Sequence, residues 1–406
     1  NFKYYSYDER KRVIKLWNII SGFDTLITEY KYNSQDQITI YSHTGPEDTK
    51  TYRNTYDYAG RLSKVDYYIG VPDIIEPEYI NIAEYSYNEN SQVNSQRFNN
   101  NSLENIFTYN NRNWVTDIRN TDNYFRSENS YFKNGNVKTQ NLSGDYSRNM
   151  AENNDLSFNY TYDKSNRLLS SYTSGNIYNL TNTYDKDGNI ITLDRKGRTG
   201  NSIDSFAYDY YSGTNKLLRI RDGKEQFFYD ANGNMTEDDL NKNINIKYNY
   251  RNLITQLQHT EITSTDTNIY LTYYGYDEAG NRILKKVYKS VTNTEVSDTL
   301  NEGDMNISNG WIQYNAGIYS RDVSGKELAI YKNGDILEYP VYGLDLIGKI
   351  KNDEMYYYFK DHLGSVRATV NSSGEVVSAQ DYDAWGYLLQ DRTFDSEDSK
   401  FKFTGK

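Results

Sequence analysis

The chain has 406 residues, a formal net charge of −11 and a hydrophobic content of only 36%. The negative charge argues against nucleic acid and anionic membrane surfaces as partners, because both favour a basic face. It contains no cysteine, which excludes disulfides and thiolate chemistry, and no apolar run long enough for membrane insertion. Tyrosine alone accounts for 44 residues, so we expect a core of amphipathic rings with polar tips.

A tyrosine recurs every 19 to 31 residues over the first 280 residues. The twelve anchor tyrosines are Tyr7, Tyr32, Tyr56, Tyr87, Tyr109, Tyr131, Tyr162, Tyr184, Tyr208, Tyr229, Tyr248 and Tyr276. In ten units the residue six places on is apolar, as Val13 is after Tyr7 and Leu62 is after Tyr56. A period of this length predicts one supersecondary unit that is stacked many times.

Each unit carries the side chains of a tight turn. The residue after the anchor is Asp or Asn in eleven units, and the fourth residue after it is Gly, Asn or Asp in nine. Asp and Asn cap turns, and all three residue types tolerate positive φ. The anchor and the sixth residue are symmetric about the third, which predicts a hairpin with a three-residue loop. The residues assigned to this structural motif include Tyr56, Asp57, Gly60, Tyr162, Asp163, Tyr184, Asp185, Gly188, Tyr229, Asp230, Gly233, Tyr276, Asp277 and Gly280.

The segments that flank each turn are predicted strands. Aromatic residues two places apart, such as Tyr5 with Tyr7 and Tyr30 with Tyr32, share a face and should form ring ladders along the sheet. We interpret the tyrosines mainly as sheet-packing residues; the alternative is a groove in which some stack sugar rings. The units at Tyr208, with about three extra residues, and at Tyr276, with Ile283 one place late, are interpreted as insertions or bulges.

The spacing breaks after Ile283, and a polar stretch, roughly 291–310, separates the repeats from a different segment. That segment contains D-H-L-G-S at Asp361–Ser365, Y-D-A-W-G at Tyr382–Gly386 and F-T-G-K at Phe403–Lys406. We therefore expect an all-β fold, with a spiralling β-hairpin solenoid over residues 1–290 and a more irregular β region over 291–406.

The whole chain resembles the Rhs, or YD-repeat, family. The repeats are similar to its Y-D-x-x-G-R/N-L units, and the C-terminal segment resembles its Rhs repeat-associated core. The residues that carry the core motif are Asp361, His362, Leu363, Gly364, Ser365, Tyr382, Asp383 and Gly386. The resemblance implies a sheet that spirals into a hollow shell, closed at one end by the core. Bacterial members are polymorphic toxins, whose shell holds a variable C-terminal toxin, and teneurins are the animal relatives.

Catalytic chemistry is not supported by the residues present. The family's self-cleaving core uses aspartates in D-P-x-G motifs that follow F-T-G-K, and this chain contains no D-P-x-G. His43, His259 and His362 have no partner at ligand spacing. The calcium-like D-K-D-G-N at Asp185–Asn189 is better explained as a turn, because Lys196 stands where a calcium loop needs Glu. Asp361, Asp381 and Asp383 could form a carboxylate cluster, but turn capping is the preferred interpretation. We expect no enzyme activity, no metal and no cofactor.

The leading hypothesis is a structural shell fragment of a secreted or cell-surface bacterial Rhs protein, carrying a covalent C-terminal toxin that lies outside this sequence. Secretion-system or surface components are its expected partners. Because Asn1 opens almost directly onto a repeat, we expect the chain to be a piece of a longer protein. The alternative is a Tyr-rich extracellular adhesin or self-assembling filament protein that binds glycans or neighbouring copies. A third possibility is an enzyme whose catalytic residues lie beyond Lys406.

Overall fold

The computed structural model describes residues 2–69, 79–220, 223–224, 226–264, 266–292, 302–396 and 399–405. Over these residues the chain is built of antiparallel β-strands with four short 3-10 helices, which confirms the all-β prediction. No helix within these ranges is long and apolar enough to cross a membrane. The chain forms two compact units: unit 1 comprises Asn1–Lys50 and Ala207–Tyr339, and unit 2 comprises Thr51–Phe206 and Pro340–Lys406.

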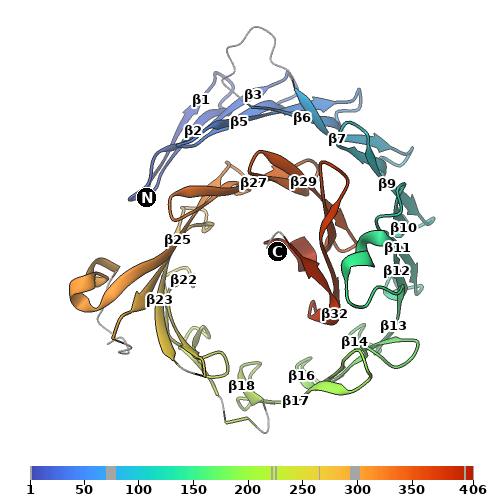
Figure 1. Cartoon of the computed structure of the whole chain (residues 1–406), viewed down its shortest axis with the longest axis vertical. Helices are drawn as coiled ribbons and strands as arrows, with labels where there is room; N and C mark the ends of the chain where they lie inside the picture. Colours follow the sequence, from blue (N-terminus) through green and yellow to red (C-terminus); the bar gives the residue numbers. More distant parts are fainter. Residues whose placement is uncertain are drawn as a thin grey trace. The chain divides into compact units, whose positions relative to one another are not determined.

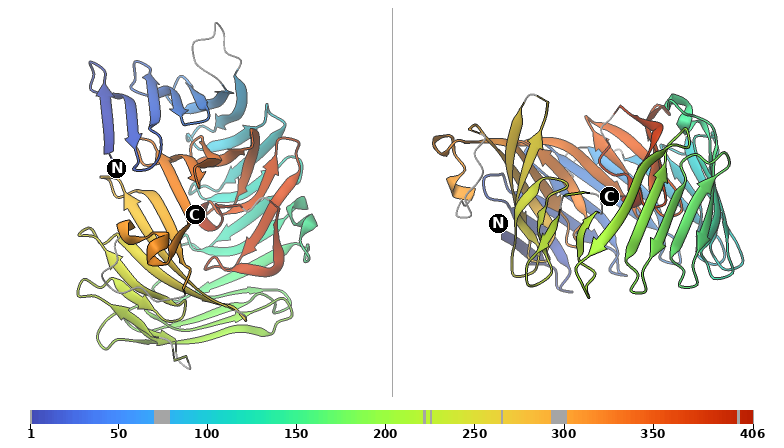
Figure 2. Two further views of the ribbon diagram at one scale, coloured as in Figure 1. Left: turned by 60° about the vertical axis from the view of Figure 1, so that its left-hand side comes forward. Right: turned by 90° about the horizontal axis from the view of Figure 1, so that it is seen from below.

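Each unit combines an earlier and a later part of the chain. Its strands pair with their neighbours in sequence, as Figures 1 and 2 show for the successive hairpins. Unit 1 contains β1 (Phe2–Tyr7), β2 (Val13–Ile19), β3 (Leu26–Tyr32), β4 (Ile38–Thr44), β18 (Leu217–Ile220), β19 (Phe227–Tyr229), β20 (Met235–Asp238), β21 (Asn243–Tyr248), β22 (Ile254–Ile262), β23 (Thr267–Tyr276), β24 (Arg282–Ser290), β25 (Trp311–Arg321), β26 (Glu327–Lys332) and the 3-10 helices η2 (Glu302–Asp304) and η3 (Ile307–Asn309).

Unit 2 contains six of the twelve anchor tyrosines, as many as unit 1. Its elements are β6 (Leu62–Ile69), β7 (Ile80–Tyr87), β8 (Val93–Phe98), β9 (Leu103–Tyr109), β10 (Val115–Asn120), β11 (Arg126–Tyr131), β12 (Val137–Ser143), η1 (Asp145–Asn149), β13 (Leu156–Tyr162), β14 (Leu168–Thr173), β15 (Leu180–Tyr184), β16 (Ile190–Lys196), β28 (Leu346–Lys351), β29 (Glu354–Lys360), β30 (Val366–Asn371), β31 (Val376–Tyr382), β32 (Leu388–Asp395) and η4 (Phe403–Gly405). Three strands, β5 (Thr49–Tyr56), β17 (Ser202–Tyr210) and β27 (Asp335–Tyr342), cross between the units. The division of the sequence near residue 290 stays a prediction.

The repeat turn has the predicted geometry. Ten anchors pair with the residue six places on, as Tyr109 does with Val115. All nine Gly, Asn and Asp residues at the fourth position have φ between 58° and 97°. In the Tyr56 unit, Asp57 Oδ1 accepts the backbone N–H groups of Ala59 and Arg61 at 2.9 Å. The aspartate at the start of the turn therefore satisfies backbone donors that the sheet cannot reach.

Of the two units interpreted as irregular, the Tyr208 unit has the expected insertion and the Tyr276 unit does not. Tyr276 pairs with Arg282, six places on, so this unit has the ordinary register and the interpretation of an insertion there is wrong. In the other unit the strand continues past Tyr208, and Tyr210 pairs with Leu217, seven places on. Gly213, at φ 70°, lies in this longer turn. The three extra residues that were expected after Tyr208 are therefore confirmed: two of them extend the strand to Tyr210, and one lengthens the turn.

Adjacent hairpins are joined by the hydroxyl groups of the anchors. Seven anchors donate to the carbonyl oxygen of the sixth residue of the preceding unit at 2.5–2.8 Å: Tyr32 to Val13, Tyr87 to Leu62, Tyr109 to Val93, Tyr131 to Val115, Tyr184 to Leu168, Tyr248 to Met235 and Tyr276 to Ile254. We call this contact the Tyr–carbonyl bond. It explains why the recurring residue is tyrosine, since phenylalanine would leave the carbonyl without this donor.

An arginine at the fifth position reinforces the same contact in three units. Arg61 pairs with Asp57 of its own turn, and its guanidinium lies 4.4 Å from the ring centre of Tyr87 in the next unit. Arg12 over Tyr32 and Arg167 over Tyr184 repeat this arrangement. The backbone N–H and guanidinium of Arg61 hold the pKa of Asp57 below its usual range. A charged turn thus also covers the neighbouring aromatic ring.

In each unit, strands from the later part of the chain pack on the repeat hairpins. In unit 1, Tyr331 of β26 lies against Phe23, with ring centres 4.9 Å apart. The hydroxyl oxygen of Tyr331 is 3.4 Å from Nε2 of His43 in β4. Burial lowers the pKa of His43 to about 4. In unit 2, strands β29–β32 form a second layer over the repeat strands, where Phe98 stacks on Tyr357 at 5.2 Å (Figure 1).

The region expected to be more irregular uses the same turn four more times. Each of these turns is capped by an Asp or Asn, and the glycine four places after the anchor position has φ 81° to 88°. The capping residues are Asp322, Asp361, Asn371 and Asp383. The residues before them, Arg321, Lys360, Val370 and Tyr382, pair with the residue six places on. The repeat geometry therefore continues where three of the four anchor tyrosines are lost.

Gly188→Val tests the left-handed turn position. Gly188 has φ 96°, and a Cβ there would meet only Arg167 Nη1 at 3.8 Å, so the effect isolates backbone strain. We expect a loss of about 1–3 kcal/mol in the free energy of unfolding, measured by urea denaturation. Gly188→Asn is the matched control, because Asn113, Asn166 and Asn252 occupy the same position. Equal stability of the Val and Asn variants would contradict the turn assignment.

Tyr109→Phe tests the Tyr–carbonyl bond. The substitution removes the 2.7 Å hydrogen bond to the Val93 carbonyl and keeps the ring. We therefore expect the free energy of unfolding, measured by urea denaturation, to fall by about 0.5–1.5 kcal/mol. Tyr7→Phe is the control, since Tyr7 is 56% exposed and has no preceding unit among the residues described. It should change stability by less than about 0.5 kcal/mol. Equal losses of stability in Tyr109→Phe and Tyr7→Phe would show that the Tyr–carbonyl bond does not stabilise the stack.

Candidate functional site

The core motif D-H-L-G-S forms a capped turn in unit 2, between β29 and β30. Asp361 Oδ1 accepts the N–H groups of Leu363 and Ser365 at 2.9 and 3.0 Å. Gly364, at φ 81°, donates its N–H to the Asp361 carbonyl. This motif therefore has the geometry of a repeat turn, with Lys360 in the place of the anchor.

The second core motif, Tyr382–Gly386, forms the turn between β31 and β32. Asp383 Oδ1 accepts the N–H groups of Trp385 and Tyr387, and Gly386 has φ 88°. The ring of Phe403 lies against Gly386, where a Cβ would come within 2.5 Å of it. The F-T-G-K segment thus packs on this turn through Phe403, while Lys406 lies outside the described residues.

The predicted carboxylates meet in a buried ionic network centred on Arg367 of β30. The guanidinium donates to Asp361 Oδ2 at 2.8 Å and to Asp381 Oδ1 at 3.1 Å. Asp381 also accepts from Arg392 at 2.7 Å and from the hydroxyl of Tyr146 at 2.9 Å. The side chains of Arg367, Arg392 and Asp381 are each at most 4% exposed. Burial raises the pKa of Tyr146 well above its usual value, so its hydroxyl stays protonated and donates.

Asp383 belongs to a second ion pair that joins the two layers of unit 2. Its Oδ2 accepts from Arg195 Nε of β16 at 2.8 Å, and Arg195 also pairs with Asp204. Arg392 adds contacts to the backbone carbonyls of Glu152 and Asn154. Each of the three core aspartates therefore faces at least one guanidinium, and the Asp383–Arg195 pair connects a core turn to β16.

Turn capping, the preferred interpretation, describes Asp361 and Asp383 but not Asp381. Asp381 lies within β31 and acts only through its ion pairs and the Tyr146 hydroxyl. The sequence analysis missed Arg367, Arg392, Arg195 and Tyr146. An available signal was the charged residue inside the apolar strand V-R-A-T-V, since a buried arginine requires paired carboxylates.

The three histidines occupy different environments. His362 follows Asp361 in the turn, and its Nδ1 lies 3.4 Å from the Gln140 amide nitrogen. Burial lowers the pKa of His362, so the ring is neutral near pH 7. His259 Nδ1 lies 3.0 Å from Asn243 Oδ1, and His43 is enclosed by Tyr331 and Ser320. Across the described ranges, no three His, Asp or Glu side chains form a group that could hold a metal.

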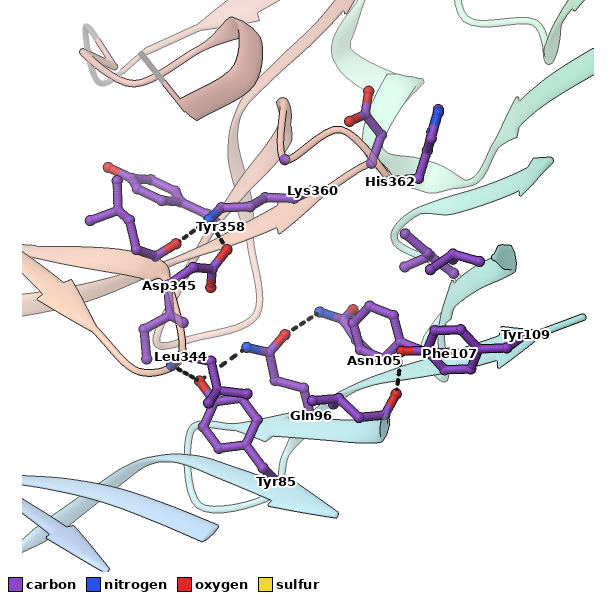
Figure 3. Close-up of a pocket in the computed structure, with 17 residues that line it drawn as sticks. Tyr85, Gln96, Asn105, Phe107, Tyr109, Leu344, Asp345, Tyr358, Lys360 and His362 are labelled. Carbon is purple, nitrogen blue, oxygen red and sulfur yellow. Dashed lines mark hydrogen bonds and ion pairs between the residues drawn. The ribbon is translucent and has the colours of Figure 1, made fainter. Parts of the chain in front are cut away.

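Two cavities in unit 2 flank the D-H-L-G-S turn. The first, the Lys360 cavity, has a volume of about 300 Å³ and lies between this turn and strands β7–β10 (Figure 3). The second, the Trp385 cavity, has a volume of about 260 Å³ and is lined by Tyr160, Tyr162, Tyr382, Trp385 and Phe403 among others. Asp361 and His362 line both. This part of unit 2 is the candidate functional site, because it combines cavities with the residues of both core motifs.

No protein-family model matches the chain. The tRNA3(Ser)-specific nuclease WapA of Bacillus spizizenii is 28% identical over 251 residues, which are 60% of this chain and 9% of the relative. The tRNA nuclease WapA of Bacillus subtilis is 26% identical over 251 residues, with the same coverage. The chain therefore spans about a tenth of the length of these relatives.

Solved structures share the fold over nearly the whole chain. The crystal structure of TcdB2-TccC3 matches 99% of this chain, and 21% of its own, with a TM-score of 0.72 and 14% identity. The Photorhabdus luminescens Tc holotoxin pore with a TccC3-D651A mutation matches 98% of this chain, and 20% of its own, with a TM-score of 0.69 and 14% identity. At this identity the similarity shows the fold alone, which is the antiparallel β-architecture that these structures share with this chain.

Arg367→Met tests whether the ionic network holds unit 2 together. The substitution leaves the Asp361 and Asp381 carboxylates buried without their shared cation, so we expect a loss of about 3–5 kcal/mol in the free energy of unfolding. The measurement is urea denaturation at pH 7. Arg148→Met is the control, because Arg148 and Asp145 are 72% and 48% exposed, and their pair should contribute less than about 1 kcal/mol. Similar small losses in both variants would argue against the network.

Proposed function

We propose that this chain is part of the wall of an Rhs-type shell that carries or delivers a toxin. The observation that carries this proposal is the fold shared with TcdB2-TccC3 over 99% of the chain. The similarity to WapA is compatible with the same role, because the chain aligns with about a tenth of proteins that are named as tRNA nucleases, which leaves room in them for a separate effector domain. The cargo is a C-terminal domain that these 406 residues do not include.

The repeats and the core motifs play different parts in this wall. We assign the anchor units to YD repeats and the region around Asp361 and Asp383 to the Rhs repeat-associated core. The repeat turn at both core motifs supports this assignment, since the core then extends the same hairpin stack. The Tyr146–Asp381 hydrogen bond and the Arg195–Asp383 ion pair fix the core strands to the repeat hairpins inside unit 2.

The chain acts in this proposal as a container wall and not as a catalyst. The buried core aspartates are held by Arg367, Arg392 and Arg195, and a buried, paired carboxylate is a poor general base. We also propose a secreted or cell-surface location, with secretion-system or surface components as partners.

Particle shape tests the proposal. A protein in which this chain is joined to its proposed cargo should appear in electron micrographs as a hollow particle with internal density. Scattering at several concentrations should give one particle size, because a closed wall leaves few sheet edges for association. A compact solid particle would overturn the container role.

The second candidate, a self-assembling surface protein, rests on Tyr58 and Tyr250, which are 99% and 94% exposed at turn tips. Exposed aromatic rings commonly mark contact surfaces. In the same scattering experiment, particle mass that grows with concentration and returns to a constant value in Tyr58→Ala/Tyr250→Ala would favour this candidate.

A further inference from the structure

The Lys360 cavity has one polar wall from the repeat sheet. A chain of hydrogen bonds crosses it: Asn105 Nδ2 donates to Gln96 Oε1 at 3.4 Å, and Gln96 Nε2 donates to Tyr85 Oη at 3.3 Å. The backbone N–H of Leu344 also donates to Tyr85 Oη, at 3.4 Å. These hydrogen bonds fix the orientation of the Gln96 and Asn105 side-chain amides. Each amide keeps further hydrogen-bonding capacity, since an amide has two donor hydrogens and an acceptor oxygen.

The opposite wall presents an ion pair. Lys360 Nζ donates to Asp345 Oδ2 at 2.7 Å and to the Leu346 carbonyl. The side chain of Lys360 is 15% exposed and that of Asp345 is 60% exposed, so the pair lies where the cavity meets solvent. Because each charge is balanced by the other, this wall offers a donor beside an acceptor without net charge.

Aromatic side chains line the cavity beside the amides. Phe107 and Tyr109 of β9 lie next to Asn105 in Figure 3. The Tyr109 ring is held in place by its bond to the Val93 carbonyl. A rigid ring face costs little entropy when a ligand packs on it.

From these walls we propose that the Lys360 cavity binds a neutral sugar of about one ring, such as the terminal residue of a glycan. Each sugar hydroxyl both donates and accepts, which suits the Gln96–Asn105 amides on one wall and the Lys360–Asp345 pair on the other. The C–H face of the ring packs on Phe107 or Tyr109. The volume of about 300 Å³ lies at the lower end of the range for small-molecule sites, ~300–1,000 Å³.

Other ligand classes fit this cavity less well. An anion such as phosphate would face the Asp345 carboxylate, and the nearby Lys360 is already paired. A free cation would compete with Lys360 for the same carboxylate. A purely apolar ligand would leave the buried amide of Asn105 without a partner for its remaining hydrogen-bonding groups. Sugar binding goes beyond the container role, and neither depends on the other.

The test titrates the full chain with glucose, galactose, mannose and N-acetylglucosamine, using saturation-transfer NMR and calorimetry. We expect at least one sugar to bind, and glucose 6-phosphate to bind more weakly than glucose. Gln96→Met and Phe107→Leu should each weaken the preferred sugar at least tenfold. Gln140→Met is the matched control, because Gln140 is an amide of the same unit that lines the Trp385 cavity and should leave binding unchanged.

Two variants guard against an effect on folding. If Gln96→Met lowers the thermal transition, Phe107→Leu and Lys360→Met decide the outcome, since they alter different walls of the cavity. Absence of binding by all four sugars would overturn the proposal, as would full-strength binding in the variants with altered walls. Loss of binding in Gln140→Met alone would place the sugar in the Trp385 cavity and would equally reject this site.

Discussion

The Tyr–carbonyl bond extends the stacking of hairpins beyond the end of the backbone ladders. The ladder between β8 and β9 covers Ser95–Phe98 and Leu103–Ile106, and so ends before Val93 and Tyr109. Tyr109 extends the contact by donating to the Val93 carbonyl from its side chain. The same bond recurs in both units. It links a turn to the preceding hairpin at the end of the sheet, where backbone pairing has stopped and water would otherwise compete for the carbonyl.

The sequence predicted what is local to one hairpin. Turn capping by Asp57 and positive φ at Gly60 depend only on residues within a few places of each other, so residue type and spacing were sufficient. The pairing of Tyr276 with Arg282 was missed because hydrophobicity was used to set the register. A capped turn fixes the register by backbone bonds alone, whether the sixth residue is apolar or charged.

What the sequence could not supply is the pairing of distant residues. The Arg367 network joins Asp361, Asp381 and Arg392 to Tyr146, which lies more than 200 residues away in the chain. No periodicity connects these positions, since the contact arises only when the core strands lie over the repeat sheet. The Lys360 cavity was unpredictable for the same reason: Gln96 and Lys360 become neighbours through layer packing.

Buried ion pairs suit this layer contact better than an aliphatic core would. The repeat strands of unit 2 bury polar side chains such as Asn105, Ser127 and Gln140, and an apolar partner layer would leave their amides and hydroxyls unsatisfied. These contacts also impose one alignment, because a shift of the core strands along the repeat sheet would separate Asp383 from Arg195 and Asp381 from Tyr146. The polar layer contact then leaves cavities with hydrogen-bonding walls, whereas close-packed aliphatic side chains would fill them. The scarcity of aliphatic residues in this chain is therefore linked to the polar cavities between its layers.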